Sequence, residues 1–201
     1  EIYDMFLVMA KEFITAGFLN PEHTAEFERI CPEEPTPEQV EELTERYRRV
    51  GGRTPLLEIT RQVATALERR LRETENGSYK VYVGMKHWHP YIAETVGQMA
   101  GDGVERIIGL PLAPHYSRMS TDVYRNALVD AMRSRSLFTP LRFIESWYGN
   151  PRFVTSTAER VQEALADLAP EGAAGLEVVF TAHSLPRSIV RLGDPYPEEL
   201  L

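Results

Sequence analysis

Cysteine is nearly absent from this sequence, which has Cys31 alone among its 201 residues. A single thiol excludes an internal disulfide framework and any metal site built on a CxxC pair. One unpaired cysteine also fits a reducing compartment, so we expect the protein in the cytoplasm.

Basic charge and long apolar runs are also scarce. The chain has 22 Lys and Arg against 30 Asp and Glu, a formal net charge of −8. Nucleic acid binding favours a basic face, so nucleic acid is not an expected partner. No apolar run approaches the ~20 residues of a membrane span, and we expect no integral membrane segment. The chain begins without a charged-then-apolar stretch, so we expect no secretory leader.

Several familiar site motifs are missing as well. The sequence has no GxxxxGK[ST] loop, no HExxH and no GxSxG. A dinucleotide fingerprint needs its glycines directly after a strand, whereas Gly97, Gly101 and Gly103 fall late in a predicted helix. Ser184 directly follows His183, and adjacent side chains on a strand point to opposite faces, so a catalytic serine–histidine pair is not expected there.

Stretches with strand-like and helix-like patterns alternate along the chain. Strict alternation predicts βαβ units, a parallel sheet and the α/β class, with residues 11–35 irregular. Apolar runs predict strands at residues 5–10, 79–85, 106–112 and 141–147, and another that ends at His183. Helices are predicted to begin near Thr36-Pro37, Thr54-Pro55, Pro90 and Ser120 or Thr121, with a further one over residues 154–168.

The strand that ends at His183 organises the rest of the prediction. Val178, Val179 and Phe180 form an apolar run before the histidine, and Pro186 suits a following turn or helix start. Ligands of open α/β sheets bind at the carboxyl ends of the strands. By its position alone, His183 is either a hydrogen-bonded structural residue or a chemical group.

Polar side chains also follow the other predicted strands. In residues 86–90, an extended backbone would let His87 and His89 share a metal or relay protons; the alternative is a polar strand end before a helix. Residues 113–120 offer hydroxyls beside a helix start, for a carboxylate or for ordinary capping by Ser120. Trp147 and Tyr148 fit either a half-buried aromatic pair or a wall for a flat ligand.

Six short motifs follow one another along the chain: GGRTPL, VGMKHWHP, LPLAPHYS, ESWYGNPRF, TAHSLP and GDPYP. In this order they resemble the motifs of the ferrochelatases, enzymes that insert ferrous iron into a porphyrin. The resemblance covers residues 36–201, and the residues LAPHYS and ESWY are closer to the coproporphyrin type than to the protoporphyrin type.

The resemblance implies a fold and a set of partners. The family fold has two similar lobes of parallel sheet flanked by helices, with a cleft between them. We therefore expect a chelatase-like chain with one complete lobe, residues 1–137, and the first part of a second, residues 138–201. The expected partners are a porphyrin, either coproporphyrin III or protoporphyrin IX, and Fe²⁺. Iron is a substrate here, and no prosthetic group is expected.

The resemblance also implies roles for particular residues. His183 matches the metal-binding catalytic histidine, and a neutral imidazole can bind a borderline metal or accept a pyrrole proton. Lys86 and His87 match a secondary polar pair beside the approach of the metal. The remaining matches hold the propionates by charge-assisted hydrogen bonds. These are Arg46, Tyr47, Thr54 and Tyr124.

Two departures from the family pattern lie near the start. Lys11-Glu12-Phe13 stand where the family's first strand runs into Tyr-Gly-Thr-Pro, whose tyrosine approaches the metal. Ile30 and Cys31 lie where a substrate arginine is usual, and Arg29 is the nearest candidate. The sequence also stops before the family's metal-site glutamate and terminal helix, so we expect a fragment or a reduced relative.

Other functions stay open beside a ferrochelatase. A non-catalytic tetrapyrrole-binding module would keep the cleft without the metal site, as the missing tyrosine and glutamate suggest. A cobalt chelatase of related architecture would place its histidine pair elsewhere, and the propionate-site residues argue against it.

Overall fold

The chain divides into two compact units, Glu1–Thr95 and Val96–Leu201, each described by itself below. The predicted lobes, residues 1–137 and 138–201, remain a prediction. The computed structural model describes residues 37–49, 51, 54–75, 77–169, 175–182, 185–186 and 188–201.

Helix α3 of the first unit spans Pro37–Arg49, as predicted. Proline suits the first turn because its missing N–H would have no helical partner there. Glu38 in the first turn and arginines in the last turn complement the helix dipole. Gly51 follows with φ +93°, and its amide donates to the carbonyl of Arg48 at 3.1 Å. Thr36 and Gly52, the predicted cap and part of the predicted stop, lie outside the described residues.

Helix α4 spans Leu56–Thr74 and begins after the predicted Thr54-Pro55 start. The Thr54 hydroxyl oxygen accepts a hydrogen bond from the amide of Leu56 at 3.2 Å, at the point where the helix begins. Its apolar residues recur at helical spacing, but they keep a third to a half of their surface exposed. They are Leu56, Ile59, Val63 and Leu67.

Residues 79–84 form no strand, so this prediction is wrong. Their backbone groups bond to side chains rather than to a neighbouring strand. The amide of Val81 donates to Glu68 Oε2 at 2.7 Å, and the carbonyl of Val83 accepts from the Thr95 hydroxyl at 2.7 Å. Among the described residues of this region, a single isolated bridge forms, between Met85 and Tyr91. Helix α5 follows at Ile92–Gly101.

In the described part of the second unit, two short parallel strands form a sheet. Strand β1 (Ile107–Gly109) pairs with β2 (Leu141–Phe143), with Ile108 opposite Arg142. The predicted parallel pairing is confirmed, although both strands are shorter than the predicted ranges. Gly109 permits close packing, because a Cβ there would lie 2.5 Å from Phe143 Cδ2 and 3.1 Å from Leu128 Cδ2.

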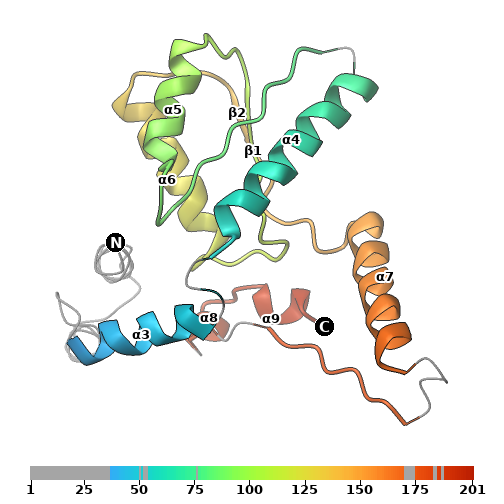
Figure 1. Cartoon of the computed structure of the whole chain (residues 1–201). Coiled ribbons are helices and arrows are strands. Elements are labelled where there is room, and N and C mark those ends of the chain that lie inside the picture. The colour runs from blue at the N-terminus through green and yellow to red at the C-terminus, as the bar shows by residue number, and fades with distance from the viewer. Residues whose placement is uncertain are drawn as a thin grey trace. The chain divides into compact units, whose positions relative to one another are not determined.

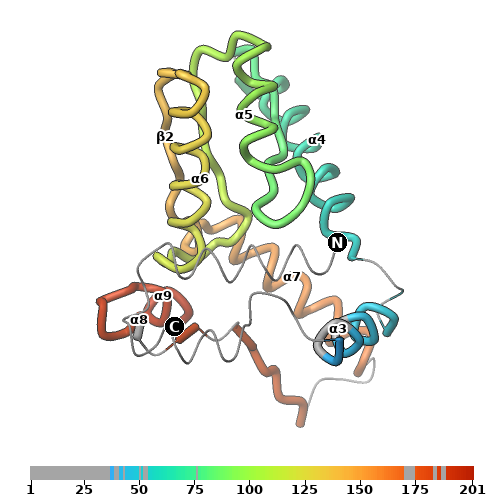
Figure 2. The backbone as a smooth tube through the Cα atoms, turned by 90° about the vertical axis from the view of Figure 1, so that its left-hand side faces the viewer, coloured from blue at the N-terminus to red at the C-terminus, as the bar shows by residue number. Residues whose placement is uncertain are grey.

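Helix α6 (Thr121–Ser134) packs against this sheet and runs beside β2 in both views (Figures 1 and 2). Leu128, Ala131 and Met132 on α6 are buried, as are Ile107 of β1 and Val96 of α5. These apolar side chains form the core of the second unit, and the burial of each large one contributes about 1.5–3 kcal/mol.

The other helices in the part of the chain that the structure describes are α7 (Pro151–Leu168), α8 (Ser188–Arg191) and α9 (Tyr196–Glu199). Helix α7 was predicted, and the Asn150 side chain caps it by accepting from the amide of Arg152 at 3.0 Å. Within the described ranges, no helix combines the length and apolarity that a membrane crossing requires.

The predicted strand before His183 is not formed in its described part, residues 176–182. Val179 and Phe180 are 78% and 75% exposed. Buried apolar residues and a hydrogen-bonded neighbour stabilise a central strand, and this run pairs with no described strand. His183 itself lies outside the described residues.

Candidate functional site

The carboxyl ends of β1 and β2 bring two of the sequence motifs together. The loop after β1 contains LPLAPHYS, and the segment after β2 contains ESWYGNPRF. The amide of Trp147 donates to the carbonyl of Pro114 at 2.9 Å, and the indole N–H of Trp147 donates to the carbonyl of Pro111 at 2.9 Å. The polar loops therefore meet at the edge of the sheet where ligands bind in α/β proteins.

The GDPYP motif joins the same edge from far along the chain. Oδ2 of Asp194 accepts from the Ser117 hydroxyl at 3.1 Å and from the amide of Arg118 at 2.8 Å. Oε2 of Glu199 accepts from the amide of Tyr116 at 2.7 Å and from the Ser146 hydroxyl at 3.0 Å. From the sequence, no role was assigned to Asp194 of this motif or to Glu199, which lies two residues beyond it.

Ser117 and Thr121 form the start of α6. The Thr121 hydroxyl accepts from the amide of Ser117 at 3.0 Å and donates to its carbonyl at 3.2 Å. The same carbonyl accepts from the amides of Ser120 and Asp122, each at 3.1 Å. Ser120 forms no side-chain capping bond, so the prediction that it could cap alone is wrong. Ser117, four residues before Thr121, supplies the bonds instead.

Aromatic rings surround His115 in this cluster. Tyr148 stacks with its imidazole at a centroid distance of 5.9 Å and 25°, and Tyr196 meets it edge-on at 6.0 Å. Burial raises the pKa of the neighbouring Tyr116 hydroxyl, and the negative charges of Asp122 and Glu145 raise it further. Tyr116 therefore keeps its proton and its capacity to donate a hydrogen bond near neutral pH.

The residues predicted to hold propionates are divided between the two units. Arg46 and Tyr47 lie on α3, where Arg46 is exposed and pairs with Glu42 at 2.5 Å. Thr54 precedes α4 and is exposed, and Tyr124 is half-buried on α6, one turn after Thr121. Because Tyr124 belongs to the second unit and the others to the first, their convergence on one substrate stays a prediction.

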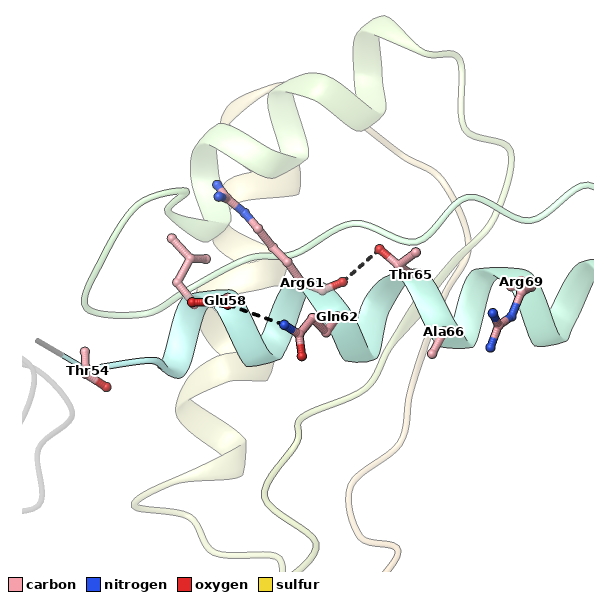
Figure 3. Close-up of a pocket in the computed structure, with 8 residues that line it drawn as sticks. Thr54, Glu58, Arg61, Gln62, Thr65, Ala66 and Arg69 are labelled. Atoms are coloured by element: carbon pink, nitrogen blue, oxygen red, sulfur yellow. Dashed lines mark hydrogen bonds between the residues drawn. The ribbon is translucent and has the colours of Figure 1, made fainter. Parts of the chain in front are cut away.

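An open hollow of about 720 Å³ runs along α4, with Thr54 at one end (Figure 3). The Gln62 amide reaches toward Glu58 at 3.5 Å, a weak contact. Neither Arg61 nor Arg69 has a carboxylate partner in the described part of the chain. Polar and charged side chains share the lining with apolar ones, and its residues are Thr54, Leu57, Glu58, Arg61, Gln62, Thr65, Ala66 and Arg69.

The segment after residues 79–85 is bent, so the prediction of an extended His87–His89 pair is wrong. The amide of Met85 donates to the carbonyl of Pro90 at 2.8 Å, which closes the intervening residues into a loop. His89 Nδ1 lies 3.0 and 3.1 Å from the two carboxylate oxygens of Glu94, and its ring meets Tyr91 at 4.4 Å. Lys86 is half-buried, and so is His87, whose Nδ1 atom is shielded from solvent.

Glu94, in the first turn of α5, binds this loop through its carboxylate. Its carboxylate accepts from the amide of Tyr91 at 2.8 Å, and that bond and the one with His89 lower its pKa. Across the residues that the structure describes, no group of three or more His, Cys, Asp or Glu is arranged to hold a metal. His183, the predicted metal ligand, is not among those residues.

A parallel pair of strands with polar loops gathered at its carboxyl edge defines an α/β protein of the ligand-binding kind. The ferrochelatase family model matches residues 19–201. The chain belongs to the ferrochelatase family, and its fold class is the chelatase-like α/β fold predicted from the sequence.

Curated relatives agree with this assignment. A ferrochelatase of Herpetosiphon aurantiacus is 44% identical over 167 residues, covering 83% of this chain and 55% of that protein. A coproporphyrin III ferrochelatase of Bacillus subtilis is 36% identical, with coverage of 83% and 54%. One from Bacillus anthracis, coproporphyrin III ferrochelatase 1, is 38% identical, with coverage of 83% and 53%. The chain spans about half the length of these relatives.

Proposed function

We propose that the complete protein inserts ferrous iron into a porphyrin in haem biosynthesis, with coproporphyrin III preferred over protoporphyrin IX. The observation that carries the proposal is the family match over residues 19–201, together with relatives named coproporphyrin III ferrochelatase. Fe²⁺ is a substrate in this reaction, and no prosthetic group takes part. We place the reaction in the cytoplasm.

The chemistry assigns His183 to the metal and to proton transfer. Insertion forms bonds from iron to the pyrrole nitrogens, and the two pyrrole N–H protons leave as water is stripped from Fe²⁺. A neutral imidazole binds a borderline metal ion or accepts one of those protons. Lys86 and His87 lie on one loop. We assign them a secondary role as a polar pair beside the metal's approach.

The substrate's carboxylate arms call for charged and hydroxyl donors. Arg46 supplies a guanidinium, and Tyr47, Thr54 and Tyr124 supply hydroxyls. Charge-assisted hydrogen bonds of this kind are shorter and stronger than neutral ones. Coproporphyrin III has four propionates and protoporphyrin IX two, so a donor-rich rim favours the coproporphyrin.

The test uses the complete reading frame, expressed as one protein. Under anaerobic conditions, Fe²⁺ and coproporphyrin III are mixed with it, and loss of porphyrin fluorescence measures insertion. His183→Ala is expected to lower kcat by about 10²-fold or more, the usual contribution of a positioned acid–base group. His89→Ala is the matched control, because its ring pairs with Glu94 and has no assigned role; it should retain wild-type rates.

A second candidate function is a non-catalytic tetrapyrrole-binding module. Lys11-Glu12-Phe13, where the family has Tyr-Gly-Thr-Pro, is the observation that favours it. Tight porphyrin binding by the wild-type protein with no iron insertion would establish the module. Turnover that survives the loss of His183 would instead overturn the assigned role of the histidine.

A further inference from the structure

Asp194 is a buried carboxylate, and among the described residues its hydrogen bonds come from the cluster at the edge of the sheet. Only 5% of its surface is exposed. Oδ2 accepts from the Ser117 hydroxyl and the amide of Arg118, and Oδ1 accepts from the amide of Tyr196 at 3.0 Å. A buried charge is costly without such donors, so these bonds hold Asp194 in one place.

Ser117 connects Asp194 to the start of α6 by hydrogen bonds. Ser117 and Thr121 are both fully buried, and they exchange two hydrogen bonds. The Ser117 hydroxyl donates to Asp194 and accepts from the amide of Met119 at 3.1 Å. The Ser117 carbonyl accepts from the amide of Asp122. The first turn of α6 is therefore built on a residue that Asp194 fixes.

Tyr124 lies one turn into α6, directly beyond this anchored start. Its side chain moves with the first turn, because a helix carries its residues at fixed angles about its axis. A change in the tilt or fraying of that turn moves the phenol hydroxyl. Hydrogen bonds tolerate little displacement, since they weaken steeply with distance and angle.

We infer that Asp194 is a positioning residue for porphyrin binding: through Ser117 it holds the first turn of α6, and thereby the Tyr124 hydroxyl, where a propionate arm is received. The inference rests on the proposed function, which makes Tyr124 a propionate ligand. It assigns to the GDPYP motif a role in substrate affinity rather than in the chemical step.

The experiment is a double-mutant cycle on coproporphyrin affinity in the complete protein, read by quenching of protein fluorescence without iron. Asp194→Ala and Tyr124→Phe should each raise Kd about tenfold. In the Tyr124→Phe background, Asp194→Ala should raise Kd less than about twofold, because both changes remove the same contact. Asp194→Asn keeps one carbonyl acceptor and should recover part of the affinity. Additive effects would overturn the route through Tyr124.

Amide hydrogen exchange of the protein without porphyrin tests the anchoring itself. In Asp194→Ala, the Asp122 amide should exchange about tenfold faster, while amides near Met132 in the same helix should be unchanged. Uniform acceleration along α6, or none, would overturn the anchoring. Asp130→Ala is the matched control: Asp130 is an exposed aspartate of α6 that pairs with Arg133, and its loss should change neither Kd nor exchange.

Val96→Ala distinguishes a positioning effect from a general loss of stability, because it removes buried volume from the core of the second unit without changing Asp194. If this variant raises Kd as much as Asp194→Ala at the same loss of Tm, the effect is not positioning. If the wild-type protein binds no porphyrin, both the proposed function and the role of Asp194 in affinity are wrong. The hydrogen-exchange measurement then decides by itself whether Asp194 anchors the first turn of α6. If the protein binds porphyrin but inserts no iron, the proposed enzymatic activity is excluded, and the positioning role of Asp194 is still supported.

Discussion

The Ser146 hydroxyl donates a hydrogen bond to the Glu199 carboxylate at 3.0 Å, across 53 residues of sequence. The same oxygen of Glu199 accepts from the amide of Tyr116 at 2.7 Å. A single carboxylate oxygen therefore ties α9 to the loop after β1 and to the segment after β2. Because both hydrogen bonds end on one carboxylate, replacing Glu199 should lower the free energy of unfolding.

Glu199→Ala is expected to lower the free energy of unfolding by about 1–3 kcal/mol, since it leaves the Tyr116 amide without its acceptor. Ser146→Ala should cost about 1 kcal/mol, and it should cost less once Glu199 has been removed. Urea denaturation of the single and double variants measures both the losses and their coupling. Independent, additive losses would show that the two side chains do not interact in solution.

Gly109→Ala should destabilise the second unit by about 1–3 kcal/mol, the usual cost of overpacking. The new methyl group would meet the Phe143 ring at 2.5 Å. Phe143→Leu in the same chain should return part of the loss by making room. Gly101→Ala is the control, because nothing lies within 4 Å of its added Cβ, and it should stay within about 0.5 kcal/mol of wild type. Equal melting temperatures for both glycine variants would contradict the close approach.

Asn150→Ala should cost about 1 kcal/mol by removing the cap of α7. The amide of Arg152 then loses the acceptor that it finds at 3.0 Å. Asn150→Asp keeps an acceptor oxygen and adds a negative charge at the positive end of the helix, so it should be as stable as wild type or slightly more stable. Thermal unfolding of the three proteins makes the comparison, and an Asp variant as weak as the Ala variant would exclude capping.

The lowered pKa of Glu94 predicts a pH-dependent contribution to stability. A carboxyl whose pKa falls on folding stabilises the protein above its unfolded value of 4.5, and this stabilisation is lost as pH falls through the folded value. Glu94→Gln should therefore melt below wild type near pH 7, and the gap should close as the pH is lowered past 4.5. A gap that is constant from pH 7 to pH 3 would mean that the charge of Glu94 does not contribute.

The helices were more predictable from the sequence than the strands, because a helix is stabilised by interactions between residues close together in sequence. Helix α3 has Pro37 at its start, and helices α4 and α7 show apolar residues at helical spacing, so neighbours in sequence supply most of the signal. A strand is stabilised by hydrogen bonds to a neighbouring strand, and the local sequence does not show which segment that neighbour is. Residues 79–84 and 176–182 have strand-like composition, yet no ladder forms there; Val81 and Val83 bond instead to Glu68 and Thr95.

The candidate site was only partly predictable for a similar reason. The carboxyl ends of β1 and β2 were expected to carry polar loops, and they meet as parallel strands require. The contribution of Asp194 was missed because it depends on a contact 77 residues away, with Ser117. The His87–His89 pairing failed because the bond from Met85 to Pro90 bends that segment. The roles of His183, Arg46, Tyr47, Thr54 and Tyr124 stay predictions.

The carboxylates of Asp194 and Glu199 take their hydrogen bonds from amides and hydroxyls, and neither pairs with a cation in the ranges that the structure describes. Ionic strength should therefore leave this junction intact, because dissolved salt mainly screens one exposed charge from another. Helix α3 has the opposite character, with Arg46 and Arg48 paired to glutamates on its open surface. Concentrated sodium chloride would loosen the pairs of α3 and spare the carboxylate junction, so the two can be probed separately without changing a residue.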